Sequence, residues 1–294
     1  MRVRAGDPLD RQVSALIRNA AATEILPRFG QLHDSEISEK TPGELVTIAD
    51  HECERLLTEG LQSLLPAARV VGEEACAVDA RLLEGLAEGL VWLVDPLDGT
   101  ANFASASGSF GVIVALAADG DTVAGWLYDP LADRMCFAAR DGGAFIASDG
   151  SAPTRLRVPP APARNIATLA TQFMPPPVRE AAIAAGAAQF ELQPIPWCAA
   201  SHYPSLALGT YQLALFQRTL PWDHAAGALL LTEAGGHVAR WDGEPYLFHD
   251  PGVGILAAAN RDLWAQGADA LFASEELRSY AGKLREERGQ AACG

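Results

Sequence analysis

A short apolar run that ends in two acids is the feature that most constrains the fold of this chain. Residues 92–94 (Trp-Leu-Val) are apolar, and Asp95, Pro96 and Asp98 follow within four positions. Proline fixes its own φ and has no N–H to offer a sheet ladder. We therefore expect a buried strand that ends in a turn at Pro96, with both carboxylates pointing into one space.

Asp95 and Asp98 would repel each other strongly in such a turn unless a divalent cation neutralised them. Hard carboxylate oxygens are ligands that suit Mg²⁺. Gly99 and Thr100, which follow directly, can open a helix whose free backbone N–H groups face an anion. The alternative is that Asp-Gly-Thr forms an ordinary turn with a helix cap. The residues from 95 to 100 thus predict a metal site beside a phosphate cradle.

Three further acidic positions could join this site. Glu73, in a Gly-Glu-Glu segment, follows a short apolar strand, and Asp223 stands at the head of an apolar helix. Asp50 lies three residues after Thr47, which is the spacing of a capping box. Taken singly, Glu73 with Glu74 would be a solvated pair, Asp223 a helix cap and Asp50 a capping acid. Together these positions favour one shared site.

Composition excludes several classes of protein. The 294 residues are 49% hydrophobic and 20% charged, which is typical of a globular chain. The net charge of −15 (22 basic against 37 acidic residues) disfavours nucleic acid as a partner. Five scattered cysteines, with no Cys-x-x-Cys pair, favour a reducing cytoplasm over a disulfide framework. The longest apolar run, 111–118, is too short for a membrane span of about 20 residues, and no targeting signal begins the sequence. We expect a cytoplasmic protein with no membrane partner.

Hydrophobic periodicity predicts an α+β N-terminal domain over 1–155 and an α/β C-terminal domain over 156–294. The Pro-rich stretch 152–162 is the predicted boundary. The first domain should contain, in order, a helix over 8–29, a mobile loop over 31–44 with Pro42, a helix over 48–66, short strands at 69–71 and 91–94, and antiparallel strands over 111–117, 122–128 and 134–147. In the second, strand-like and helix-like segments alternate at 165–171, 177–188, 204–209, 211–216, 223–234, 252–259 and 260–273.

With these motifs in place, the sequence resembles the inositol monophosphatase family of Mg²⁺-dependent, lithium-sensitive phosphomonoesterases. The first signature is residues 92–103 (WLVDPLDGTANF), and the second is 222–227 (WDHAAG). Residues 45–50 (LVTIAD) and 72–74 (GEE) match the two upstream motifs in order and spacing. The resemblance covers roughly residues 8–275 and implies a layered αβαβα sandwich, an enzyme and, usually, a homodimer.

The resemblance also implies a role for each site residue. Glu73, Asp95 and the Leu97 carbonyl would bind a first Mg²⁺. Asp95, Asp98 and Asp223 would bind a second, and Glu73 would help to hold a looser third. A metal-activated water would attack phosphorus in line, with Thr100 and Asp50 positioning and deprotonating it. The backbone N–H groups of Gly99 and Thr100 would hold the phosphate oxygens.

The substrate-facing residues depart from the pattern of inositol phosphatases. An acid that binds substrate hydroxyls a few positions before the Trp-Asp motif is replaced here by Phe216, which weakens the case for myo-inositol phosphate. Ala199 aligns near a substrate-lining stretch. Arg218 and His202 could contact a second anionic group; alternatively, they are a solvated arginine and a hydrogen-bonded surface histidine.

The expected function is Mg²⁺-dependent hydrolysis of a small polyol or sugar phosphate, a small phosphorylated metabolite. Alternatives within the superfamily are a 3′-nucleotidase for adenosine bisphosphate, a histidinol-phosphate phosphatase and a fructose-1,6-bisphosphatase. A different class of alternative is a non-catalytic regulatory protein that keeps the same fold.

Overall fold

The computed structural model describes residues 2–41, 43–148, 151–162, 165–250 and 252–291. The α-helices are α1 (Pro8–Ala20), α2 (Ile48–Leu64), α3 (Glu73–Val78), α4 (Thr100–Ala104), α5 (Pro176–Ala187), α6 (Ala199–Ala207), α7 (Pro221–Glu233), α8 (Arg261–Leu271) and α9 (Glu275–Ala291). The strands are β1 (Ile37–Thr41), β2 (Glu44–Thr47), β3 (Arg69–Gly72), β4 (Leu90–Asp98), β5 (Gly111–Ala118), β6 (Asp121–Asp129), β7 (Arg134–Ala139), β8 (Gly143–Ser148), β9 (Thr154–Leu156), β10 (Ile166–Leu169), β11 (Glu191–Leu192), β12 (Leu213–Phe216), β13 (His237–Ala239) and β14 (Ile255–Ala258).

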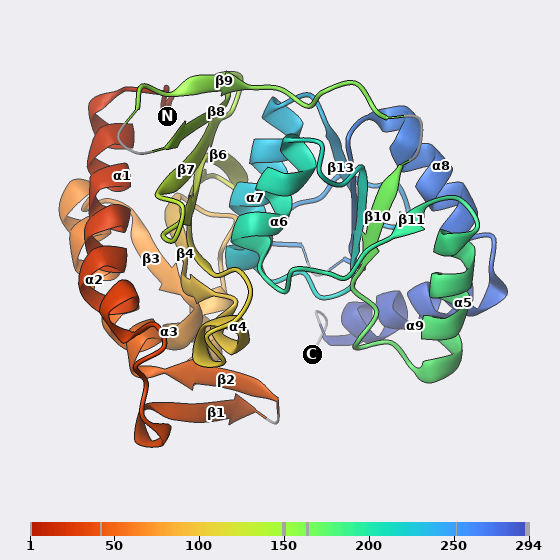
Figure 1. Cartoon of the computed structure of the whole chain (residues 1–294), viewed down its shortest axis with the longest axis horizontal. Helices are drawn as coiled ribbons and strands as arrows, with labels where there is room; N and C mark the ends of the chain where they lie inside the picture. The colour runs from red at the N-terminus through yellow and green to blue at the C-terminus, as the bar shows by residue number, and fades with distance from the viewer. Residues whose placement is uncertain (1, 42, 149–150, 163–164, 251, 292–294) are drawn as a thin grey trace.

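These elements stack in five layers (Figure 1). Helices α1 and α2 cover one face of a seven-stranded sheet of order β3-β4-β5-β6-β7-β8-β9. Helices α6 and α7 lie between that sheet and a five-stranded sheet of order β11-β10-β12-β14-β13. Helices α5, α8 and α9 form the outer layer on the far side. The predicted αβαβα sandwich is confirmed.

The two sheets differ in strand direction. The first is antiparallel except for the parallel pair β3–β4. The second is mixed, because β10 runs parallel to β11 and β12 whereas β14 runs antiparallel to β12 and β13. A purely alternating α/β pattern therefore does not describe the second half. The division of the chain into domains at residues 155 and 156 stays a prediction.

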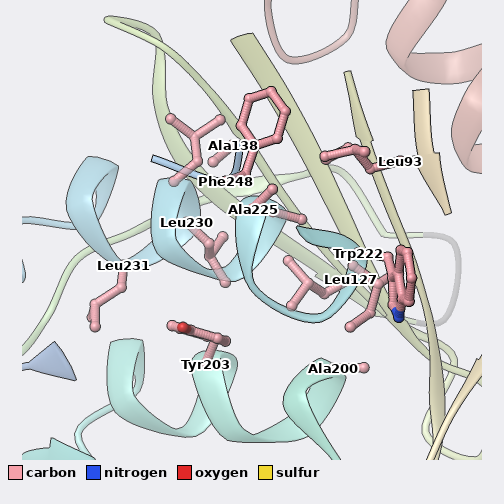
Figure 2. Packing of buried hydrophobic residues seen from close by; sticks show 14 of the residues in the cluster. Leu93, Leu127, Ala138, Ala200, Tyr203, Trp222, Ala225, Leu230, Leu231 and Phe248 are labelled. Atoms are coloured by element: carbon pink, nitrogen blue, oxygen red, sulfur yellow. The ribbon is translucent and has the colours of Figure 1, made fainter. Parts of the chain in front are cut away.

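Helix α7 lies in the middle layer, between the two large sheets (Figure 1), and its apolar side chains pack closely against their neighbours (Figure 2). Its residues Trp222, Ala225 and Leu230 are buried, and it is apolar nearly all round, as a helix enclosed on every side must be. The approach to α6 is close, since a Cβ added at Gly227 would lie 2.0 Å from Cδ2 of Tyr203. This packing places the first turn of α7 between the two sheets.

The prediction that segment 31–44 is a mobile loop is wrong. It contains the strand β1, which pairs antiparallel with β2 to form a hairpin. No residue of β1 is fully buried, so its polar sequence shows no apolar alternation from which a strand could be predicted. Gly43 lies at the turn with φ +86°, and Pro42 lies outside the described residues.

The prediction that the strand ends in a turn at Pro96 is also wrong, because β4 continues to Asp98. Asp95 pairs with Ile113 and Asp98 with Gly111, so three steps along β4 oppose two along β5. This is a β-bulge, a place where proline costs no regular ladder bond. The bulge, rather than a turn, brings the two acids to one edge of the sheet.

The helix predicted over 8–29 is regular only as far as Ala20. A π-helical segment (Ala21–Ile25) and a 3₁₀ turn (Leu26–Arg28) continue it. Pro27 in that turn has no N–H for a further α-helical bond. Within the described residues, no helix has both the length and the apolar character needed to cross a membrane.

Candidate active site

Three carboxylates from separate parts of the chain meet at one point. Glu73 opens α3 directly after β3, Asp95 lies at the bulge of β4, and Asp223 lies in the first turn of α7. One oxygen of each lies within 4.8 Å of an oxygen of the other two. The seven-stranded sheet thus supplies one of these carboxylates and the central helix another.

These carboxylates stand in an unfavourable environment for free anions. Asp95 is only 2% exposed, and desolvation together with the charges of Glu73, Asp98 and Asp223 raises its pKa well above the usual range. Desolvation and the charges of Glu73 and Asp98 likewise raise the pKa of Asp223. A bound divalent cation would remove this cost, because it turns the mutual repulsion into shared attraction.

The donor set fits a hard cation such as Mg²⁺. It consists of carboxylate oxygens, which are what Mg²⁺ prefers, and Leu97, whose carbonyl is the further predicted donor, lines the same cleft. One cation of the protein already lies beside the group, since Nζ of Lys40 is 2.8 Å from Oε1 of Glu73 and 2.5 Å from Oε1 of Glu74. The hairpin therefore brings a positive side chain to the edge of the acidic group.

Asp98 lies beside this group but faces a different partner. Its Oδ2 accepts a 2.6 Å hydrogen bond from the backbone N–H of Ala200, in the first turn of α6. Desolvation raises the pKa of Asp98 to about 6, although this hydrogen bond acts in the opposite direction. Asp98 therefore connects the bulge of β4 to the start of α6 through this hydrogen bond.

Asp50 and Thr100 form a hydrogen-bonded pair. Thr100 Oγ1 lies 2.9 Å from Oδ1 of Asp50 and 2.9 Å from the carbonyl oxygen of Leu97. The other oxygen of Asp50, Oδ2, accepts hydrogen bonds from the N–H (2.8 Å) and hydroxyl (2.6 Å) of Thr47. Asp50 is thus the capping acid of α2 and also the hydrogen-bond partner of Thr100, and its catalytic role stays a prediction.

The turn that precedes Thr100 requires glycine. Gly99 has φ +84°, and a Cβ there would lie 2.8 Å from the carbonyl oxygen of Ser109. As the residue before α4, Gly99 leaves its own N–H and that of Thr100 without helical partners. Asn102, in the same short helix, donates from Nδ2 to the carbonyls of Ser109 (2.7 Å) and Pro196 (2.9 Å).

A cleft of about 520 Å³ contains almost all of the residues that the sequence predicted for the site. Those lining it are Glu73, Asp95, Leu97, Asp98, Gly99, Thr100, Ala199, Phe216, Arg218 and Asp223. Asp50 is buried behind Thr100 and reaches the cleft through that hydroxyl. The two upstream motifs and the two signatures therefore converge on one cavity.

Comparison with known proteins shows to which family the chain belongs. A model of the inositol monophosphatase family matches residues 7–275. The chain belongs to this family. It is 31% identical over 271 residues to an inositol-1-monophosphatase of Caulobacter vibrioides, a match covering 86% of this chain and 97% of that protein. It is 30% identical over 220 residues to one of Bacillus subtilis, covering 74% and 81%.

A solved structure gives the same result. Inositol monophosphatase II of Staphylococcus aureus superposes with a TM-score of 0.74 at 26% identity, covering 96% of this chain and 98% of that one. The family comprises metal-dependent phosphomonoesterases, so this chain is a phosphoric monoester hydrolase that acts on a small phosphorylated metabolite.

The wall of the cleft opposite the acids is aromatic in this family member. Phe216, 7% exposed, packs edge-on against His202 and His224. Nε2 of His202 lies 2.7 Å from the Thr168 hydroxyl, and Nδ1 of His224 lies 2.8 Å from the Tyr203 hydroxyl. His202, considered above as a surface residue, is therefore buried. Desolvation lowers the pKa of His202 to about 3 and that of His224 to about 4, so both are neutral at pH 7.

Sequence reasoning missed four residues that shape the cleft or its edge. Lys40 and Asn102 had no pattern that pointed to the site, although Asn102 lies inside the first signature. Phe173 and Trp197 also line the cleft, and only their unusual exposure, which needs a structure, distinguishes them. Arg218, predicted to contact substrate, lines the cleft with its guanidinium paired to Glu44 of β2.

Proposed function

We propose that the protein hydrolyses a small phosphate monoester in a Mg²⁺-dependent reaction. The observation that carries this proposal is the meeting of Glu73, Asp95 and Asp223 within 4.8 Å, in a cleft that Thr100 also lines. An acidic group alone would be unremarkable. Its position beside a threonine that is hydrogen-bonded to a buried acid supplies the parts that hydrolysis needs.

The proposed ligand sets follow the family pattern. Glu73, Asp95 and the Leu97 carbonyl hold a first ion, and Asp95, Asp98 and Asp223 hold a second. Glu73 contributes to a third, looser position. When bound, Mg²⁺ supplies Lewis-acid activation of water and stabilises charge on the phosphate and the leaving oxygen.

Thr100 and Asp50 give the water proton a path. The Thr100 hydroxyl donates to Asp50 Oδ1, which leaves an oxygen lone pair free to accept from a water in the cleft. As the water oxygen bonds to phosphorus, the ester P–O bond breaks, the water proton moves to Thr100 Oγ1 and the threonine proton moves to Asp50. The alcohol leaves as an alkoxide that takes its proton from a second water, and inorganic phosphate remains. Desolvation raises the pKa of Asp50, which makes this carboxylate a better proton acceptor than an exposed aspartate.

The backbone N–H groups of Gly99 and Thr100 bind the phosphate oxygens. Because Gly99 adopts φ +84°, the chain turns sharply between the bulge of β4 and α4. Both N–H groups therefore lie next to the proposed ligands Leu97 and Asp98, where the phosphate has to sit to meet the water.

The charges of the cleft favour a substrate with a single phosphate. Arg218 is the only lysine or arginine among the described residues that line it, and its guanidinium is already paired with Glu44. His202 and His224 are neutral at pH 7, as their lowered pKa values require. A second phosphate would therefore find no unpaired cation, which argues against bisphosphate substrates. Phe216 likewise offers no acceptor for polyol hydroxyls.

A substrate panel tests the proposal. The purified protein is assayed with inositol 1-phosphate, histidinol phosphate, adenosine 3′,5′-bisphosphate and fructose 1,6-bisphosphate, each with Mg²⁺ and with excess EDTA. We expect Mg²⁺-dependent release of phosphate from at least one monoester and slower release from both bisphosphates. Hydrolysis that persists in EDTA would contradict the metal-dependent mechanism. Metal binding without turnover of any ester would instead support a regulatory role.

We propose three further properties, the first two of them from the family alone. Lithium should inhibit in the millimolar range, the chain should form a homodimer, and the protein should act in the cytoplasm, where the scattered cysteines, rather than the family, support the last proposal. Light scattering tests the dimer directly, since the chain mass is 31.1 kDa and a dimer would have twice that mass.

A further inference from the structure

Exposed aromatic side chains are concentrated at the cleft. Among the described residues, the large apolar side chains with high exposure include only two aromatic ones, Trp197 at 52% and Phe173 at 53%. Both line the cleft that contains the acidic group. Large exposed aromatic surface is unfavourable in water, so its occurrence at this one place points to a ligand that covers it.

Trp197 is held in a conformation that the backbone does not favour. Its φ is +54°, in the left-handed region that bulky residues rarely occupy and that costs free energy of conformation. The chain is fixed on both sides: the Pro196 carbonyl accepts from Nδ2 of Asn102, and Cys198 is the N-cap residue directly before α6. A strained position that keeps a tryptophan at the rim of a cleft is the pattern expected of a functional residue.

Phe173 is held from its own side of the cleft. The guanidinium carbon of Arg218 lies 5.9 Å from the centre of its ring, a cation–π contact, and the same guanidinium is paired with Glu44. The cleft is also lined by the apolar residues Ile195 and Leu220. The outer cleft thus offers aromatic and apolar surface, beside the polar side chains of Gln172 and Gln217, which also line it.

We propose that this outer cleft binds the alcohol part of the substrate through a flat aromatic ring, which stacks on Trp197 and Phe173. The proposal rests on the phosphatase function above and specifies its substrate class: a monoester of an alcohol that carries an aryl or heteroaryl ring. Rings bind well to aromatic side chains through their faces. A polyol in the same place would exchange its water hydrogen bonds for contacts with apolar surface, which is unfavourable.

The test compares two esters that differ only in the flatness of the ring, phenethyl phosphate and cyclohexylethyl phosphate, with adenosine 2′-monophosphate as a larger aromatic ester. The variants are Trp197→Gly and Phe173→Ala. Glycine is well suited to the left-handed backbone at position 197, so this variant should fold with an unchanged or higher melting temperature. Leu131→Ala is the matched control, since Leu131 is similarly exposed (54%) and does not line the cleft.

The wild-type protein should have a higher kcat/KM for phenethyl phosphate than for cyclohexylethyl phosphate. Each cleft variant should reduce that ratio about tenfold, the scale of one lost stacking contact, and Leu131→Ala should leave it unchanged. Binding gives a second measurement: phenethyl phosphate should quench tryptophan fluorescence in the wild type but much less in Trp197→Gly.

Different failures have different meanings. Equal kcat/KM for the two esters, with no change of their ratio in either variant, would overturn the aromatic preference while leaving the phosphatase function intact. A change in oligomeric state in the cleft variants, without a change in that ratio, would show that the two rings cover a protein interface instead. If no ester is turned over, the proposed function fails, and loss of the fluorescence response in Trp197→Gly still decides whether the cleft binds the ring.

Discussion

Replacing Asp98 by Asn should make the metal-free protein more stable at neutral pH, even though the substitution removes a proposed Mg²⁺ ligand. Desolvation raises the pKa of Asp98 from 3.8 to about 6. A difference of about two pKa units between the unfolded and folded states corresponds to about 3 kcal/mol of destabilisation when the carboxylate is charged. Asn carries no charge and keeps an oxygen that can accept from the Ala200 N–H.

The sign of the pH dependence follows from the same shift. Because the folded protein binds the Asp98 proton more tightly than the unfolded chain does, the destabilisation is complete above pH 6 and disappears as the pH falls toward 4. The raised pKa values of Asp95, Asp223 and Asp50 act in the same direction. Without metal, the wild-type protein should therefore be more stable at pH 5 than at pH 7.5.

Melting temperatures in EDTA, measured from pH 5 to pH 8, test this prediction. At about 2 °C per kcal/mol for a chain of this size, Asp98→Asn should melt about 6 °C above the wild type at pH 7.5, and the difference should shrink at pH 5. The control is Asp269→Asn, the same change at an exposed position on α8. Equal melting temperatures for Asp98→Asn and wild type throughout this range would refute the inference that Asp98 is an unfavourable, partly buried charge. With Mg²⁺ added, the order of the two proteins should reverse.

Four other perturbations have expected outcomes. Thr100→Ala should lower kcat by about 10²–10⁴-fold with little change in KM, because its backbone N–H remains; a loss below threefold in steady-state assays would leave Thr100 only a structural role. Asp223→Asn should abolish turnover at saturating Mg²⁺ without lowering the metal-free melting temperature, and near-normal kcat would show that Asp223 is not a metal ligand. EDTA should remove activity, Mg²⁺ should restore it and Ca²⁺ should substitute poorly, since its larger and looser shell suits the site badly. Gly99→Ala should lower both melting temperature and activity, because φ +84° and the 2.8 Å approach to the Ser109 carbonyl exclude a Cβ; full activity would disprove that the turn must be this tight.

The parts of the site that could be predicted are those encoded by short contiguous patterns. The acids of the first signature follow an apolar strand directly, and Asp223 follows Trp222 at the head of an apolar helix, so both were found from the sequence. The apolar pattern of α7 indicated a buried helix. Their convergence across the chain needed the family resemblance, since no local pattern relates residues so far apart.

The parts that could not be predicted depend on neighbours that are distant in sequence. The strand β1 is polar because neither of its faces is fully buried, so a single strand of this kind cannot be distinguished from a loop. Pro96 correctly indicated that the regular hydrogen bonding of the strand is interrupted. A bulge and a turn both allow a proline, so the sequence does not distinguish between them. The position of Lys40 beside Glu73 depends on the hairpin. Because the hairpin could not be predicted, this contact could not be predicted either.

The location of the acidic group explains how the fold can tolerate it. Asp223 projects from a helix that is packed on both sides, with Gly227 allowing the ring of Tyr203 to approach and Gly125 allowing β6 to approach, since a Cβ there would lie 2.7 Å from Cα of Ala226. That apolar packing stabilises α7 enough to hold a carboxylate where it meets other negative charges. A cation that binds Asp223 together with Asp95 joins the central helix to the seven-stranded sheet, so its binding energy adds to the stability of the folded state. Metal affinity and core packing are therefore linked through one helix, and a change that shifts α7 should weaken both together.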